Sequence, residues 1–326
     1  MYLLLLFGVT IVLGLIYEKR AFCNYVCPVG HLLGLYALCS PVEWRAKDLK
    51  VCKDCHTKDC IAPKNYYTLK KRSCTSNLYP ATIKDNRRCL LCTHCLKVCP
   101  YGNLRLSLRR PMADFFSKIR LSNAELFFIF IVSAFVIHEI YVEWAAAKSV
   151  LFYVPAQINR FLGLSGEPSY FLRGILLFIV LPALLFFVPS VLAKALGRIP
   201  LVDAAKRYSI LILPVMAAGH IMKSLFKITS RIPYYEFLGD EPLGWNTAQL
   251  ISSGQIQLNK GFIEFISPFL SFIAVFLFVG SLIFSSVLLW RGNDSKFQSK
   301  GAKLALHIGL IVYALIYIVM VLLWRF

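Results

Sequence analysis

Long apolar runs alternate along the chain with shorter stretches that are rich in lysine and arginine. A run of about 18 or more apolar residues suggests a helix that crosses a membrane. Six runs come close to this length or exceed it, at about residues 1–17, 124–144, 171–193, 208–226, 262–290 and 303–323. The pattern therefore predicts an all-α polytopic membrane protein with about six transmembrane helices. Prolines inside the later runs should bend those helices; they are Pro182, Pro189, Pro214 and Pro268.

The first run, MYLLLLFGVTIVLGLIYEKR, has the apolar character of a signal peptide. A signal peptide carries basic residues before its apolar core and a small-residue cleavage site after it, and this run shows neither. We therefore expect a membrane helix that is retained. Its shortness also suits a helix that lies in the membrane interface or inserts only partly.

The basic residues predict how the chain is oriented. Lysine and arginine number 36 against 17 acidic residues, a formal charge of +19, and in membrane proteins they gather on the cytoplasmic side. With the N-terminus outside, segments 18–123, 194–207 and 291–303 lie inside and hold 28 of the 36. We predict a multi-pass protein of the bacterial inner membrane with segment 18–123 in the cytoplasm. No motif accompanies the charge that would indicate nucleic-acid binding.

This orientation predicts that the outer segments, 145–170 and 230–261, are loops. Their tyrosines and tryptophans suit the membrane–water interface. Asp240 and Glu241 are adjacent acids and suit a solvated turn. We expect these loops to carry no chemistry.

All eleven cysteines lie between Cys23 and Cys99, which indicates one metal-rich region. Four of them form the run C-x2-C-x2-C-x3-C-P, namely Cys89, Cys92, Cys95 and Cys99, followed by Pro100. Bacterial-type ferredoxins use this run to bind [4Fe–4S] clusters, and in two-cluster ferredoxins the fourth cysteine serves the other cluster. The run therefore predicts a second set of three cysteines and a returning fourth.

The second set lies upstream, in VCKDCHTKDC and in a separate segment that contributes one further cysteine. We predict two [4Fe–4S] clusters, one held by Cys52, Cys55, Cys60 and Cys99, the other by Cys89, Cys92, Cys95 and Cys74.

Two other interpretations of these cysteines stay open. Zinc also accepts four thiolates, and C-x2-C pairs are typical of zinc sites. The stretch CKDCH, from Cys52 to His56, matches the pattern for covalent haem attachment. Such attachment takes place outside the membrane, whereas the charges place this stretch inside.

These observations predict three parts. Residues 1–41 hold the first transmembrane helix, 42–123 form a small bacterial-ferredoxin-like module with the two clusters, and 124–326 form a five-helix transmembrane domain. The module carries 18 basic and 6 acidic residues, and two clusters with their thiolates bring roughly −4. Its basic surface suits an acidic ferredoxin-type or other redox protein and anionic membrane lipid.

A third motif, RAFCNYVCPVGHLLGLYA, places Cys23 and Cys27 four residues apart, hence on one face of a helix. With the two runs downstream it resembles the membrane-bound polyferredoxin superfamily, over roughly residues 15–110. That superfamily includes quinol-dehydrogenase subunits of periplasmic nitrate reductase and the nitrous-oxide-reductase regulatory membrane protein. The resemblance implies electron transfer in the membrane, commonly between a quinol and a protein acceptor.

The sequence leaves the role of Cys23, Cys27 and Cys39 open. They could form a redox-active pair or ligate a further metal centre. They could also pack as small apolar side chains, as free cysteines often do.

Three of the six histidines fall within predicted spans. His138 and His220 lie about 20 Å from the inner ends of their helices at 1.5 Å per residue, in the outer half of a hydrocarbon layer about 30 Å thick. His307 lies near an inner end. Two histidines at one depth could bind a haem b or line a quinone site with Glu139 and Glu143, or form hydrogen bonds between helices.

The sequence thus predicts a membrane-bound iron–sulfur protein that passes electrons between a membrane quinone pool and a protein redox partner. We expect it to work with other subunits of a larger respiratory complex. No pattern indicates a nucleophile or general base, so it does not read as a bond-making catalyst. The alternative is a redox sensor, or a factor that assembles or matures metal centres.

Overall fold

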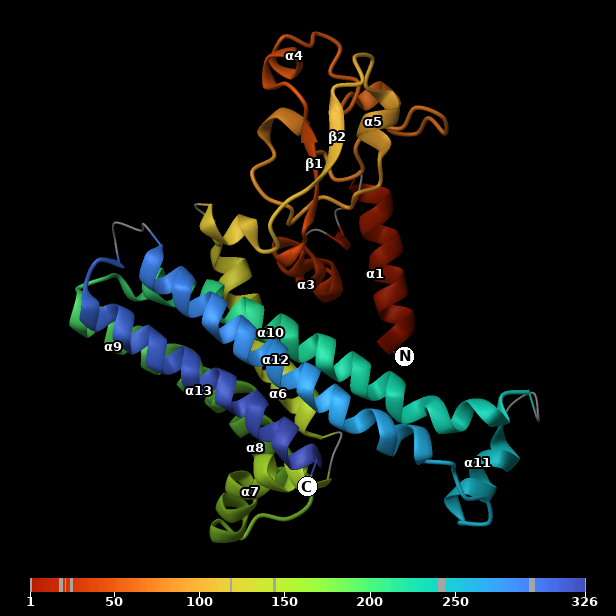
Figure 1. The fold of residues 1–326 in the computed structure, drawn as a ribbon, viewed down its shortest axis with the longest axis vertical. Coiled ribbons are helices and arrows are strands. Elements are labelled where there is room, and N and C mark those ends of the chain that lie inside the picture. The colour runs from red at the N-terminus through yellow and green to blue at the C-terminus, as the bar shows by residue number, and fades with distance from the viewer. Residues whose placement is uncertain are drawn as a thin grey trace. The chain divides into compact units, whose positions relative to one another are not determined.

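The computed structural model describes residues 2–17, 20, 22–23, 26–117, 119–142, 145–239, 244–292 and 297–325. The chain divides into two compact units, Met1–Phe128 and Ile129–Phe326 (Figure 1). Glu143, Asp240 and Glu241, which were assigned possible roles above, lie outside the described residues.

The first unit begins with α1 (Tyr2–Ile16), which the sequence predicted as a membrane span. Its 15 residues extend about 22 Å at 1.5 Å per residue, less than the roughly 30 Å of a bilayer's hydrocarbon core. As described, α1 is therefore apolar but short for a complete crossing. The other elements of this unit are α3 (Pro28–Tyr36), η1 (Ala37–Cys39), β1 (Val42–Ala46), α4 (Leu49–Lys53), η2 (Pro63–Asn65), η3 (Pro80–Thr82), α5 (His94–Val98), β2 (Leu104–Leu108) and η4 (Ala113–Phe116).

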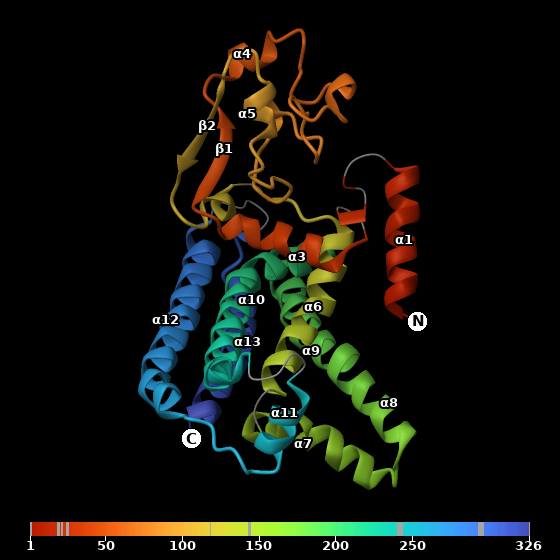
Figure 2. The ribbon, with the colours of Figure 1, turned by 90° about the vertical axis from the view of Figure 1, so that its right-hand side faces the viewer.

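A two-stranded ribbon organises this unit. Strands β1 and β2 pair antiparallel, with Trp44 opposite Leu106 and Ala46 opposite Leu104 (Figure 2). Trp44 and Leu104 are buried, at 7% and 4% exposure. Helix α4 follows β1, and α5 precedes β2, so the ribbon joins two segments that carry the cysteines.

A buried polar network fixes the chain just before Cys89 to this ribbon. The side-chain amide of Asn86 donates to the Val42 carbonyl (2.8 Å), and its backbone N–H donates to the Asp114 carboxylate (3.1 Å). Asp114 is 3% exposed and is held by the Arg109 guanidinium, with 2.7 Å between one Nη and one Oδ. Removing one partner of such a buried ion pair typically costs about 3–5 kcal/mol. The backbone N–H of Cys89 then donates to the Asn86 carbonyl (3.1 Å).

The second unit is helical, and it contains most of the apolar surface. Together with α6, which runs into it from the first unit, the described residues hold five helices that are long and apolar enough to cross a membrane. They are α6 (Asn123–Tyr141), the continuous stretch Glu167–Gly197, the stretch Leu201–Phe237 that begins with α10 (Leu201–Arg231), α12 (Gly261–Arg291) and α13 (Lys300–Arg325). These five match the later five predicted spans. The ends of each helix lie close to the predicted bounds or extend beyond them.

One of these stretches contains a widened turn. Helix α8 (Glu167–Ile175) passes through the π-helical turn η5 (Leu176–Val180) into α9 (Leu181–Gly197). Pro182 is the second residue after this turn; it has no N–H, and its ring would meet the carbonyl of Phe178 in a regular α-helix. The proline therefore accounts for the local change in winding that the sequence led us to expect as a bend.

Segments 145–170 and 230–261, which the sequence predicted as loops, contain helices. Helix α7 (Ala145–Phe161) is amphipathic, and α11 (Trp245–Ser252) is short; the turn η6 (Ile232–Phe237) extends α10. Polar and basic residues such as Lys148 and Arg160 interrupt the apolar pattern of α7, so a search for long apolar runs passed over it.

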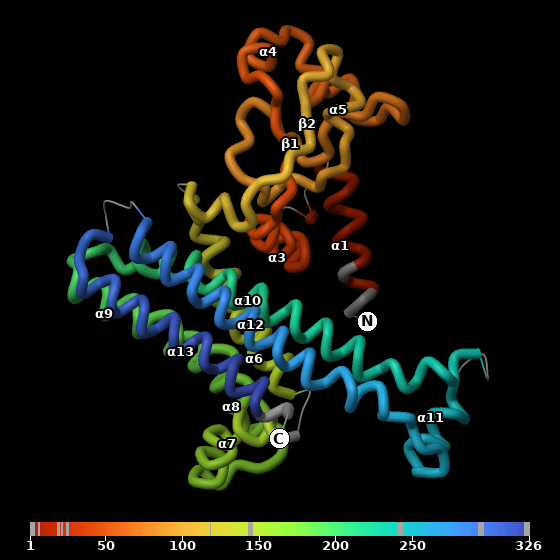
Figure 3. The backbone as a smooth tube through the Cα atoms, in the orientation of Figure 1, coloured from red at the N-terminus to blue at the C-terminus, as the bar shows by residue number. Residues whose placement is uncertain are grey.

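Helices α9, α12 and α13 lie side by side in this unit (Figure 3). Gly309 of α13 packs against the ring of Pro189 in α9, and a Cβ atom there would overlap that ring and lie 3.2 Å from Tyr208. Gly280 of α12 offers a contrast, because a Cβ there would meet no atom within 4 Å. The close approach of α9 and α13 thus depends on a glycine.

We expect Gly309→Ala to lower the stability of the membrane unit by about 1–3 kcal/mol, because the methyl group overpacks a filled interface. Gly280→Ala adds the same methyl group in open space and should leave the stability unchanged or raise it, because alanine is the better helix former. Thermal unfolding of both purified variants in one detergent checks the difference. Equal melting temperatures for the two would contradict this packing.

Candidate functional site

Eight cysteines of the first unit line two recesses. Recess 1 is lined by Cys52, Cys55, Cys60 and Cys99 together with Tyr79 and Asn103. Recess 2 is lined by Cys74, Cys89, Cys92 and Cys95 together with Trp44 and Arg88. Each recess therefore draws three cysteines from one run and the fourth from the other segment.

Recess 1 is formed around helix α4. Asp48 caps the helix by accepting a hydrogen bond from the Lys50 N–H (2.8 Å). Buried Asn103 holds this turn, because its amide oxygen accepts from the Asp48 N–H (3.0 Å) and its amide nitrogen donates to the Asp48 carbonyl (2.6 Å). The same nitrogen lies 3.3 Å from Cys52 Sγ as a donor. The hydroxyl of Tyr79 donates to the Cys52 carbonyl.

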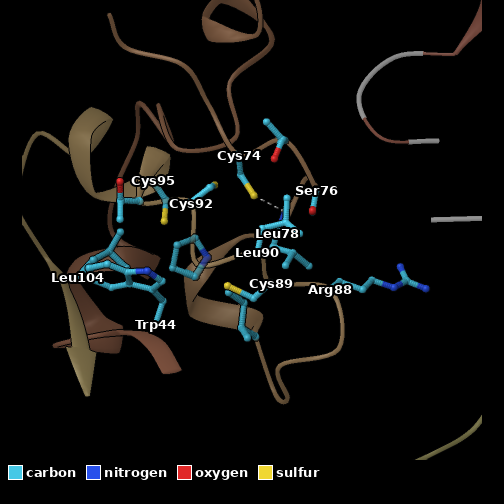
Figure 4. A pocket seen from close by; sticks show the side chains of 14 residues that line it. Trp44, Cys74, Ser76, Leu78, Arg88, Cys89, Leu90, Cys92, Cys95 and Leu104 are labelled. Atoms are coloured by element: carbon cyan, nitrogen blue, oxygen red, sulfur yellow. Dashed lines mark hydrogen bonds between the residues drawn. The ribbon is translucent and has the colours of Figure 1, made fainter. Parts of the chain in front are cut away.

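Recess 2 is formed by the turns that lead into α5. Leu91 and Thr93 adopt left-handed backbone conformations, with φ of 54° and 63°, and these turns wrap Cys89, Cys92 and Cys95 around the recess. Figure 4 shows the cysteine side chains gathered around it, with Cys74 arriving from the opposite segment. The N–H of Leu78 donates to Cys74 Sγ (3.4 Å), the kind of bond that stabilises a negatively charged sulfur.

The two recesses adjoin each other. Pro80 and Leu104 line both of them. The N–H of Cys74, in recess 2, donates to the carbonyl of Cys60, in recess 1 (2.7 Å). One wall of side chains and one backbone hydrogen bond therefore connect the two cysteine sets.

The pKa values of the thiols reflect the same grouping. Burial raises the pKa of Cys60 to about 11, and the nearby thiols of Cys99, Cys55 and Cys52 add to the effect. Burial likewise raises the pKa of Cys95 to about 12, with added repulsion from its own set. Four thiolates in such a recess need a positively charged partner, which a metal centre supplies.

The donor set can be tested against the kinds of metal site considered. A single zinc ion needs its thiolates about 2.3 Å from one point. Among the described residues, no three His, Cys, Asp or Glu side chains stand close enough to hold one ion. Each set of four thiols instead surrounds a recess. In number and kind, the four thiols of each recess match the four cysteines that hold an iron–sulfur cluster.

The third cysteine group lies apart from both recesses. Cys27 precedes α3 and donates its N–H to the Phe22 carbonyl (2.8 Å), and the backbone of Cys23 packs against Gly30. Cys39 ends η1, where burial raises the pKa of its thiol to about 12 and the Asp114 carboxylate adds to the effect. Neither recess is lined by any of these three cysteines.

The second unit holds a charged pair at the level of the two predicted histidines. Lys223 of α10 forms an ion pair with Glu139 of α6 (2.5 Å). His138 packs its ring against Phe178, with 5.0 Å between centroids. Both His138 and His220 lie within electrostatic reach of the pair. His307 lies elsewhere, where it contacts the hydroxyl of Ser286 (3.0 Å).

Some residues that support the site could not be identified from the sequence. Asn103, Tyr79 and Asn86 position the cysteine turns through hydrogen bonds to backbone groups distant in sequence. Asn103 lies four residues after a cysteine of the long run, but only the fold brings it to Asp48 and Cys52. Glu139 and Lys223 are each visible as a charge in an apolar run, but the sequence does not show that they pair.

Comparisons with known proteins bear on about a third of the chain. Residues 1–51 match a family model described as a 4Fe-4S binding domain. A protein of Methanocaldococcus jannaschii named "Uncharacterized protein MJ0749" is 33% identical over 103 residues, which cover 32% of this chain and 36% of that protein. "Putative electron transport protein YccM" of Escherichia coli is 29% identical over 113 residues, 33% of this chain and 28% of that protein. No solved structure matches.

The chain thus spans about a third of the length of these relatives, and the family model ends before Cys52. The matches support an iron–sulfur cluster and an iron–sulfur electron-transfer family. The five apolar helices have the length and composition of membrane-spanning helices. Together they fit a membrane iron–sulfur electron-transfer protein. The coarse prediction from the sequence is supported to that extent, and the cluster number, the quinone and the partner are not part of it.

Cys39 offers a test of the surroundings of the third group. Because its thiol has a raised pKa of about 12, the reactive thiolate at pH 8 is on the order of one molecule in ten thousand. We expect iodoacetamide to label Cys39 more than a hundredfold more slowly than free cysteine, and the rate to rise about tenfold per pH unit up to pH 11. Mass spectrometry of the labelled peptide measures this. The same reaction in urea is the control, and equal rates in both would contradict the buried site.

Proposed function

We propose that each recess binds one [4Fe–4S] cluster, with Cys52, Cys55, Cys60 and Cys99 as the ligands in recess 1 and Cys74, Cys89, Cys92 and Cys95 in recess 2. The grouping of eight thiols into two sets of four is the observation that carries this proposal. The crossed arrangement, in which each run lends its last cysteine to the other set, is the one typical of two-cluster ferredoxins. When bound, the clusters supply one-electron chemistry.

The protein then transfers electrons between a membrane quinone pool and a protein redox partner. The shared wall of Pro80 and Leu104 supports this, because two clusters on either side of it would be near neighbours. We place the module at residues 42–123 on the cytoplasmic side of a bacterial inner membrane, with the N-terminus outside, on the grounds of the 28 basic residues. Other subunits of a respiratory complex would supply or accept the electrons.

We place the quinone near the Glu139–Lys223 pair. Charged residues inside a membrane helix are costly and often mark a functional site. A carboxylate and two histidines beside it can accept the protons that a quinol releases when it is oxidised. The pair favours a quinone site over a haem b held by His138 and His220, because charged side chains lie between the same two helices.

The cluster ligands can be tested by substitution. We expect the anaerobically purified protein to hold about eight irons. Cys74→Ala should lose about half of them, because it removes one ligand from recess 2 and none from recess 1. Iron and sulfide analysis, with electron paramagnetic resonance of the reduced protein, measures both the loss and the surviving cluster.

Cys39→Ala is the matched control and should keep the full iron content, since Cys39 lines neither recess. Full iron in Cys74→Ala would contradict the ligand sets. Zinc in place of iron in the unmodified protein would remove the basis of the proposed function.

The quinone site is tested with the double variant Glu139→Gln/Lys223→Met, which leaves no unpaired charge in the membrane. We expect a short-chain ubiquinol to reduce the clusters of this variant at least tenfold more slowly, because the proton acceptor is lost. Such groups typically contribute about 10²–10⁴-fold to a rate. Stopped-flow absorbance measures the rate. Lys148→Met, which removes an exposed charge of α7, is the control.

Dithionite should reduce the clusters of all three proteins equally. An unchanged quinol rate in the double variant would place the quinone elsewhere. No reduction of the unmodified protein by any quinol would favour a sensor or an assembly factor instead.

A further inference from the structure

A closed, basic loop projects between the two cysteine sets. We call residues 63–73, PKNYYTLKKRS, the basic loop. The Ser73 N–H donates to the Asn65 carbonyl (3.0 Å) and closes its base. Inside it, the Thr68 hydroxyl lies within hydrogen-bonding distance of the carbonyls of Asn65 (3.1 Å) and Lys71 (2.9 Å). The loop is therefore an ordered element, not a slack connection.

The tip of the basic loop presents apolar side chains to solvent. Leu69 is fully exposed and Tyr67 is 78% exposed. Single exposed apolar residues are common on protein surfaces. Two of them lie here at the tip of one hydrogen-bonded loop and contribute nothing to the core, which fits a surface that is covered in a complex.

Three consecutive cations flank this tip. Lys70, Lys71 and Arg72 are all exposed, and none of them is in an ion pair within the part of the chain that the structure describes. At the base of the loop, the carboxylate of Asp59 is paired with Lys64 (3.0 Å). The tip thus combines unneutralised positive charge, which steers an oppositely charged partner, with an apolar and an aromatic side chain.

The base of the basic loop is linked to both recesses. Asp59, which lines recess 1, accepts a hydrogen bond at its carbonyl from the Asn65 side chain (3.2 Å). Cys74, which lines recess 2, follows the loop directly. A protein bound to the loop is therefore held at a segment that runs from a cysteine of recess 1, Cys60, to a cysteine of recess 2, Cys74.

We propose that the basic loop is the docking element for an acidic, one-electron carrier protein. The inference rests on the proposed function and names the partner of its clusters. Three cations attract a carrier with an acidic surface, and Tyr67 and Leu69 supply the small apolar contact of a short-lived complex. In the exchange one electron leaves the reduced carrier and one cluster gains it. A lipid surface would share the charge preference but gains nothing from the position beside both recesses.

The test uses the full-length holoprotein in nanodiscs of neutral lipid, with reduced flavodoxin, an acidic carrier, as the probe. Stopped-flow absorbance gives the second-order rate of cluster reduction at several NaCl concentrations. The loop variant is Lys70→Gln/Lys71→Gln/Arg72→Gln. The charge-matched control is Lys47→Gln/Arg105→Gln/Arg110→Gln, which removes three exposed cations from the ribbon region. For the apolar part, Leu69→Ser is compared with Leu108→Ser, which is 83% exposed on β2.

At low salt we expect the loop variant to react about tenfold more slowly than the unmodified protein and to lose most of its salt dependence, within the 10–10³-fold range of electrostatic steering. The control triple variant should change the rate less than threefold. Leu69→Ser should slow the reaction several-fold, and Leu108→Ser should leave it unchanged. Dithionite reduction and iron content should be the same in all five proteins.

An equal loss of rate in both triple variants would overturn the proposal, because the net charge of the unit would then do the steering. An effect of the loop variant that appears only in nanodiscs with anionic lipid would overturn it in favour of a lipid surface. Reduction of the clusters by a quinol but not by the carrier would remove this docking site and leave the proposed function intact. Absence of clusters from the unmodified protein would instead remove the proposed function.

Discussion

The antiparallel pairing of β1 with β2 determines where both cysteine runs lie. It places Ala46 opposite Leu104; Cys52 follows the first of these by six residues, and Cys99 precedes the second by five. Two cysteines that are 47 residues apart in the chain thereby line the same recess. A shift of register by one residue would turn Leu104 to the other face of the ribbon, and Leu104 belongs to the walls of both recesses. A ribbon of five pairs thus positions eight thiols.

The spacing of the cysteines made their grouping predictable, because C-x2-C runs have a known use. The two-stranded ribbon that brings the two cysteine runs together was not predictable in detail. VEWRA and LRLSL are five residues each, and strands this short give little alternation to detect. The five long helices were predicted because apolar runs of their length are rare outside membranes. Amphipathic α7 was missed because polar and basic residues interrupt its apolar pattern. The short α1 shows that an apolar run can be shorter than a full membrane crossing requires.

A single sequence does not show which residues pair with each other in the folded protein. Glu139 and Lys223 are 84 residues apart, and each could be recognised as a charge in an apolar helix. Which charge neutralises it depends on how α6 meets α10, and that depends on the tertiary packing of the helices. The same holds for Asn86 and Asp114, whose burial is tolerable only because Arg109 and the backbone of the ribbon satisfy them.

The hydrogen bond that closes the segment at residues 65–73 makes the position of its two ends independent of the sequence of its tip. The cysteines on either side need fixed positions, and the hydrogen bond between Ser73 and Asn65 holds the ends of the stretch together whatever lies between them. Replacement, lengthening or grafting of the intervening residues therefore leaves the ends in place. The segment therefore tolerates changes of sequence at its tip that the neighbouring thiol positions do not.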